Sequence, residues 1–120
     1  MDLGDHFPDV PPPVLIAAAK HYEAVFFDVP IEAWERTGSF MARWVEGVRI
    51  GFAPRQKYAS IHFQTGEATE LYRMLGGTCP AARVTINLPY GEAVDAERIR
   101  HVIDRVVAAG PRSARASTSR

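Results

Sequence analysis

The chain has little of what marks exported, membrane or disulfide-linked proteins. Cys79 is its only cysteine, so no intrachain disulfide can form and nothing indicates an oxidising compartment. Its longest apolar run, residues 14–19, is far shorter than the ~20 residues that span a bilayer. Asp2, Asp5 and Asp9 stand where a secretory signal would carry positive charge. We therefore expect a cytoplasmic protein that is not embedded in a membrane.

The chain also lacks an excess of either charge, since its 14 basic and 14 acidic side chains cancel. A protein that wraps a nucleic-acid backbone normally carries a clear surplus of Lys and Arg, so nucleic acid is disfavoured as a partner. Neither a serine-hydrolase elbow nor a nucleotide-binding glycine loop is present. The sequence therefore does not identify a cofactor, which stays unknown, and it favours a binding protein over an enzyme.

Length and composition predict one globular domain with two short extensions. The chain has 120 residues, of which 47% are hydrophobic and 23% charged, as is typical of a single folded domain. Residues 1–12 mix acids, glycine and prolines and predict a flexible arm. Residues 13–110 form the predicted domain, and residues 111–120, which are small, polar and basic, predict a disordered tail.

Apolar spacing predicts three helices and four strands. The helices are expected at residues 13–25, at residues 65–75 with Thr65 as N-cap, and from Asp95 to Gly110. The strands are expected at residues 40–45, as a pair within residues 47–63 joined by a short turn that contains Pro54, and at residues 83–88, while residues 31–38 show no clear pattern. This order predicts a two-layer α+β fold, with a four-stranded, mainly antiparallel sheet and helices packed on one face.

The alternation along these strands predicts a second, polar face of the sheet. Its expected members are Arg43, Arg49, Tyr58, Ser60, His62, Arg83, Thr85 and Asn87. Such a face could form an anion-binding platform, a dimer interface or an ordinary solvated surface. The assignment depends on register, because a slip of one residue moves every side chain to the other face.

Short motifs in the second half of the chain resemble a known family. They are residues 51–58 (GFAPRQKY), Ile61, Leu75-Gly76 and the helix start at Val94-Asp95. Together they resemble the YdhG-like family, a bacterial domain of unknown function, over most of residues 34–107. The resemblance implies a small cytoplasmic α+β domain, and one branch of the family is described as frataxin-like, with a proposed role in handling iron. Where such proteins often carry a Lys-Thr-Gly-Lys loop, residues 78–83 here leave only Arg83 to supply charge.

Arg55 and Lys57 match the Pro-Arg-x-Lys pattern of that family and stand at the predicted hairpin turn. Their charges could hold a carboxylate or a phosphate, or could simply be solvated. The candidate ligand-binding residues are Arg49, Arg55, Lys57, Tyr58, His62 and Arg83. The leading hypothesis is a binding domain that uses them to hold a small anionic ligand, a metal-bearing partner or a second copy of itself as a homodimer.

Two alternatives remain open at this stage. One is a small enzyme that uses Cys79 or His62 in a pocket between sheet and helices, which would require an activated thiolate or base. The other is iron handling, which the family resemblance alone suggests. Its candidate ligands are Glu97, His101 and Asp104 at helical spacing, and Asp2, Asp5, His6 and Asp9 in the arm. The first group is more typical of the solvated face of a helix, so no metal site is assigned.

Overall fold

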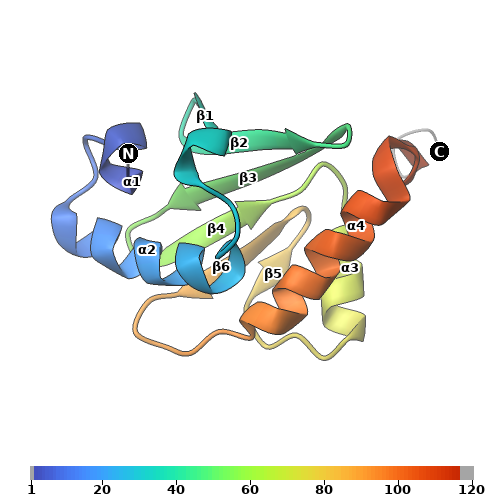
Figure 1. The fold of residues 1–120 in the computed structure, drawn as a ribbon. Coiled ribbons are helices and arrows are strands. Elements are labelled where there is room, and N and C mark those ends of the chain that lie inside the picture. The colour runs from blue at the N-terminus through green and yellow to red at the C-terminus, as the bar shows by residue number, and fades with distance from the viewer. Residues whose placement is uncertain (1, 117–120) are drawn as a thin grey trace.

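An antiparallel sheet and a layer of helices make up the protein (Figure 1), of which the computed structural model describes residues 2–116. Side chains are described up to residue 110. In chain order the elements are α1 (Leu3–His6), α2 (Pro12–Val25), the 3-10 helix η1 (Ile31–Ala33), β1 (Glu35–Thr37), β2 (Phe40–Val45), β3 (Val48–Pro54), β4 (Tyr58–His62), α3 (Glu67–Met74), β5 (Ala81–Ala82), β6 (Thr85–Pro89) and α4 (Ala96–Ala116).

The sheet confirms the α+β prediction but has six strands, so the predicted number of four is wrong. Its strands lie in the order β1-β2-β3-β4-β6-β5, and every neighbouring pair is antiparallel. The two strands that the sequence did not predict are β1, with three residues, and β5, with two. Segments this short contain too few residues for a period of two to be visible.

The helices cover one face of the sheet, with α2 and α4 lying across it and α3 packed beside α4 (Figure 1). Between the layers lies a core of apolar side chains. It includes Val25, Met41, Ile50, Phe52, Ile61, Ile86, Leu88, Ile99 and Val102, all of which are at most 1% exposed. An aromatic cluster of Tyr22, Phe26, Trp34 and Phe52 extends this core beneath η1, with ring centroids 5.1–6.1 Å apart.

The register of β2 corrects part of the predicted polar face. Arg43 pairs with Ile50, and directly opposed residues of an antiparallel pair point to the same side of the sheet. Arg43 therefore lies on the helix-covered face. The prediction was wrong because β2 carries bulky apolar residues on both sides, and Phe40 and Trp44, which suggested the core, lie on the uncovered face.

Arg83 is also absent from that face. It occupies the turn between β5 and β6 with φ of 54°, a left-handed conformation that a strand residue does not adopt. The uncovered face keeps the remaining predicted members: Arg49, Tyr58, Ser60, His62, Thr85 and Asn87.

Both ends of the chain contain helical segments. In the N-terminal segment, for which a flexible arm was predicted, Leu3 and Phe7 are buried and the side chain of Asp2 caps α1. α4 breaks at Gly110, where φ is 72°, as the sequence predicted. The backbone of residues 111–116 is again helical, although a disordered tail was predicted from residue 111, and residues 117–120 lie outside the described residues. Within residues 2–116, no helix is both long and apolar enough to cross a membrane.

Candidate functional site

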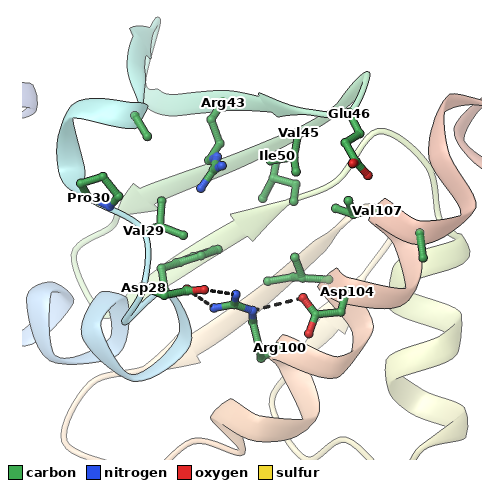
Figure 2. A pocket seen from close by; sticks show the side chains of 14 residues that line it. Asp28, Val29, Pro30, Arg43, Val45, Glu46, Ile50, Arg100, Asp104 and Val107 are labelled. Carbon is green, nitrogen blue, oxygen red and sulfur yellow. Dashed lines mark hydrogen bonds and ion pairs between the residues drawn. The ribbon is translucent and has the colours of Figure 1, made fainter.

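A hollow of about 380 Å³ opens on the helix-covered side of the sheet (Figure 2). It lies between the segment that joins α2 to η1, the β2–β3 hairpin and the middle of α4. Nine of its lining residues are apolar: Phe26, Val29, Pro30, Ala33, Val45, Ile50, Ile103, Val107 and Ala108. The charged ones are Asp28, Arg43, Glu46, Arg100 and Asp104. Small-molecule pockets in proteins commonly have volumes of roughly 300–1,000 Å³ and mainly apolar walls with a few polar groups.

Arg43 extends from β2 into this hollow (Figure 2). It is half-buried, and its guanidinium donates no hydrogen bond to, and forms no ion pair with, another described residue. Its guanidinium carbon lies 5.8 Å from the centroid of the Trp34 ring. That ring is fixed in turn, because Trp34 Nε1 donates to the Tyr22 hydroxyl at 2.8 Å and this hydroxyl donates to the Val29 carbonyl at 2.6 Å. An aromatic network thus lies beside a cation whose donors have no acceptor among the described residues.

Arg100 lies across the hollow and, unlike Arg43, makes several hydrogen bonds to neighbouring residues. It donates two hydrogen bonds to the Asp28 carboxylate, at 2.5 and 2.6 Å, and one to Asp104 at 3.2 Å. A further bond, of 3.2 Å, reaches the Val25 carbonyl at the end of α2. The hydrogen bonds from Arg100 lower the pKa of Asp28, and they raise that of Arg100 itself. This arginine therefore ties α4 to the end of α2, and its charge is already neutralised.

Glu46 stands at the mouth of the hollow, in the turn between β2 and β3. Its φ of 51° places it in the left-handed region, and Gly47 follows with φ of 82°. Figure 2 shows its carboxylate directed toward α4, near Val107. It is exposed, and no hydrogen bond or ion pair joins it to another described residue. The hollow thus has two charged side chains, one positive and one negative, that make no hydrogen bond or ion pair to another described residue.

The structure separates the six predicted ligand-binding residues. Arg55, Lys57 and Tyr58 lie at the β3–β4 turn, whereas Arg49 lies six residues back along β3. At about 3.3 Å per residue, the backbone of Arg49 is some 20 Å from that of Arg55. Arg83 lies at yet another turn, next to α3. One small anion cannot contact all of these residues at once.

At the turn, the Arg55 side chain is held by neighbouring residues. Its guanidinium donates to the carbonyl and the hydroxyl of Ser39, at 3.3 and 3.4 Å. Lys57 and Tyr58 are exposed, and neither makes a side-chain hydrogen bond to another described residue. Of the two turn cations, therefore, Lys57 is the one whose side chain makes no hydrogen bond or ion pair to another described residue.

His62 lies under a stack of side chains on the uncovered face. Its ring centroid is 5.2 Å from that of Phe40, and the guanidinium carbon of Arg49 lies 5.3 Å from the same Phe40 ring. Phe40 covers Gly51, where an added Cβ would come within 2.8 Å of the ring. Burial, together with the charge of Arg55, lowers the pKa of His62, while its Nδ1 is 3.0 Å from Thr85 Oγ1 and its Nε2 is buried without a partner. At neutral pH the ring is uncharged and binds no anion through charge.

Cys79 belongs to a closed cluster at the start of α4. Its backbone N–H donates to the Tyr72 hydroxyl at 2.8 Å, and its sulfur lies 3.6 Å from Asp95 Oδ1. Burial and the Asp95 charge raise the pKa of the thiol, so the reactive thiolate is disfavoured at neutral pH. Neither Cys79 nor His62 lines the hollow between sheet and helices, which weakens the enzyme alternative.

The residues considered as iron ligands do not converge. Glu97 and His101 are exposed on α4, and Asp104 accepts a hydrogen bond from Arg100. In the arm, Asp2 and Asp5 cap α1 through the reciprocal hydrogen bonds of a capping box. Within the described residues, no group of three or more His, Cys, Asp or Glu side chains could hold a metal ion.

Comparison with protein-family models, with curated proteins and with solved structures found no match for this chain. The site must therefore be argued from its own geometry. Sequence reasoning missed Arg43 as a pocket residue, because its position depends on the register of β2. Two apolar residues in the same row, Met41 and Val45, were the only signal that could have placed Arg43 on the covered face.

Proposed function

We propose that the protein is a non-enzymatic binding protein that holds a small organic acid in the hollow beneath η1, with Arg43 as the anchor for its carboxylate. The observation that carries this proposal is the half-buried, unpartnered guanidinium on an otherwise mainly apolar wall. A polar group withdrawn from water without a partner costs free energy, which a ligand carboxylate would recover through two parallel hydrogen bonds.

The walls indicate what the rest of the ligand is like. Val29, Pro30 and Ile50 line the hollow around Arg43, and Val107 closes it on the side of α4. Contact with these side chains favours a ligand with a hydrocarbon body, since each buried CH₂ contributes about 0.8 kcal/mol. A free phosphate would leave these walls without contacts, so a carboxylate with an apolar chain fits better.

The proposed ligand is an anion, as in the sequence-based hypothesis, but the proposed binding site is the hollow at Arg43 and not the β3–β4 turn. Arg55 is occupied by Ser39, whereas Arg43 has free donors and a cavity in front of it. The resemblance to the YdhG-like family and a cytoplasmic location remain parts of this proposal. They are supported by the motif at residues 51–58 and by the composition of the chain.

Thermal unfolding in the presence of aliphatic carboxylates of graded chain length tests the assignment. A ligand at 100 times its dissociation constant stabilises a protein by about 2.7 kcal/mol, which raises the midpoint by several degrees in a domain of this size. We expect the shift to disappear in Arg43→Met and to persist in the control Arg55→Met. A series that produces no shift, or a shift that survives in Arg43→Met, would overturn the proposal.

A second candidate function is self-association through the uncovered face of the sheet. Trp44 is 64% exposed there, and Tyr58 is 38% exposed on the same side. Exposed aromatic residues are typical of protein interfaces. Sedimentation equilibrium of the wild type and of Trp44→Ser tests this candidate: a dimer that is lost in the variant supports it, and a wild-type monomer at high concentration excludes it.

A further inference from the structure

The hollow beneath η1 carries a charge pattern that a plain organic anion does not complement. Its lining holds three carboxylates, those of Asp28, Glu46 and Asp104, and two guanidiniums, those of Arg43 and Arg100, which gives a net charge of −1. A ligand with only negative charge would gain one favourable contact at Arg43 and meet a net repulsion from the rest.

The five charges differ in their hydrogen bonding. Arg100 lies between Asp28 and Asp104 and bonds to both, so this group of three keeps a net charge of −1, and Asp28 also lies within electrostatic reach of Arg43. Arg43 and Glu46 have opposite signs, and neither makes a hydrogen bond or an ion pair to another described residue. They do not neutralise each other, because no ion pair joins them in the structure.

The spacing of these two charges follows from the strand that carries them. Arg43 is on β2 and Glu46 begins the turn directly after it, three residues later. Three residues of extended chain span about 10 Å, and Val45 lies between them with its side chain toward the hollow (Figure 2). The positive end of the hollow is thus separated from its negative end by an apolar stretch.

We propose that the hollow selects a zwitterionic ligand, with a carboxylate that binds Arg43 and a protonated amine that faces Glu46, joined by a short apolar chain. This inference rests on the proposed function and names the class of ligand: an amino-carboxylic acid whose two charged groups are separated by several methylenes. The lining charge of −1 supports it, because a cationic group on the ligand turns the repulsion into attraction.

Calorimetric titration with four compounds of equal chain length tests the proposal. Caproate carries a carboxylate alone, ε-aminocaproate adds a terminal amine, adipate adds a second carboxylate, and hexylamine carries the amine alone. Because Glu46 is exposed, its contact with the amine is worth at most about 1 kcal/mol, so ε-aminocaproate should bind roughly three- to five-fold tighter than caproate. Adipate should bind more weakly than caproate. Shorter and longer ω-amino acids establish which length fits best.

Three variants distinguish the preference for a zwitterion from carboxylate binding at Arg43, on which it rests. In Glu46→Gln, which keeps the size of the side chain, the preference for the amine should vanish while the affinity for caproate is unchanged or slightly raised, because one repelling carboxylate is gone. The control Glu35→Gln, an exposed glutamate on β1, should keep the preference. Arg43→Met should abolish binding of every compound that carries a carboxylate.

The possible failures differ. If caproate and ε-aminocaproate bind equally across the length series, or if Glu46→Gln changes nothing, the zwitterion is excluded while the carboxylate site stands. If no compound binds, or if binding persists in Arg43→Met, the proposed function fails and this inference falls with it.

Discussion

Two polar clusters lie along α4, one closed and one open. At the start of the helix, Asp95 accepts hydrogen bonds from the Tyr72 hydroxyl at 2.7 Å, from Arg98 at 2.9 Å and from the backbone of Thr78 at 3.3 Å. Further along, Arg100 is equally well hydrogen-bonded, but Arg43 across the hollow makes no hydrogen bond or ion pair to another described residue. Charged side chains near α4 are therefore fully hydrogen-bonded at the start of the helix but not all hydrogen-bonded around the hollow.

The two clusters differ in whether every polar side chain has a hydrogen-bond partner. A buried polar network whose members are all satisfied fixes a conformation and has no bonding capacity left for a ligand. A half-buried group without a partner retains that capacity, and its interaction becomes favourable only when a ligand arrives. We expect variants in the closed cluster to change stability, and variants at Arg43 to change binding.

The largest effect is expected when the closed cluster loses its acceptor. Asp95→Ala leaves the buried Tyr72 hydroxyl and the Thr78 N–H without their acceptor. It should lower the free energy of unfolding by about 2–3 kcal/mol. Urea unfolding followed by tryptophan fluorescence measures this. His101→Ala, an exposed position on the same helix, is the control and should change stability by less than about 0.5 kcal/mol. Equal effects of the two variants would mean that the cluster is not a structural unit.

Gly77→Ala should disrupt the same cluster from a different side. The added Cβ would lie 2.3 Å from the Tyr72 ring, which is held by hydrogen bonds at its hydroxyl and cannot easily move. Gly77 does not have a positive φ, so the alanine backbone is allowed and the variant reports the clash alone. We expect a loss of about 1–3 kcal/mol by urea unfolding. An unchanged midpoint would show that the ring has room to shift.

These outcomes show which parts of the molecule could be derived from the sequence. The spacing of apolar residues was sufficient for α2, α4 and the hairpin of β3 and β4, because large apolar side chains recur there at helical spacing or at every second residue. It also predicted the bounds of β2 but not which side of that strand faces the helices, because Phe40 and Trp44 on one side compete with Met41 and Val45 on the other. The site depends on this strand, so the position of Arg43 could not be predicted until the register was known.

The two arginines of the hollow offer the sharpest test of the comparison. Arg100→Met removes the bonds to Asp28, Asp104 and the Val25 carbonyl, and should lower the free energy of unfolding by about 1 kcal/mol, since the pairs are partly exposed. Arg43→Met removes an unpartnered cation, and should leave stability unchanged or slightly raised. Urea unfolding of both variants without ligand decides this, and a larger loss in Arg43→Met would indicate a protein partner for that side chain.

A smaller effect is expected from pH. The pKa of Asp28 is lowered by its hydrogen bonds to Arg100, so this carboxylate stabilises the folded state above its unfolded pKa of about 4. That stabilisation is lost as the pH falls through the lower, folded pKa. In Asp28→Asn the decline of stability below about pH 4 should therefore be shallower than in the wild type. Thermal midpoints of both proteins measured from about pH 5 down to about pH 2.5 test this. Parallel curves of midpoint against pH for the wild type and Asp28→Asn would rule it out.

Alkylation of Cys79 should not follow the kinetics of an open thiol. Burial and Asp95 raise its pKa, so at neutral pH iodoacetamide should react several-fold more slowly than with an unstructured cysteine peptide. The rate should rise toward the peptide value in urea. A folded protein that reacts as fast as the peptide would reopen the enzyme alternative.

The short outer strands of the sheet have a consequence for how the protein behaves at high concentration. A long, flat edge strand is a template on which other chains add and aggregate. Here β1 offers three residues, two of which, Glu35 and Arg36, are charged, and β5 offers only two. Neither of these outer strands is long enough by itself to support an extended intermolecular ladder. The protein can therefore expose an aromatic residue such as Trp44 on a broad sheet face while remaining protected from edge-to-edge polymerisation.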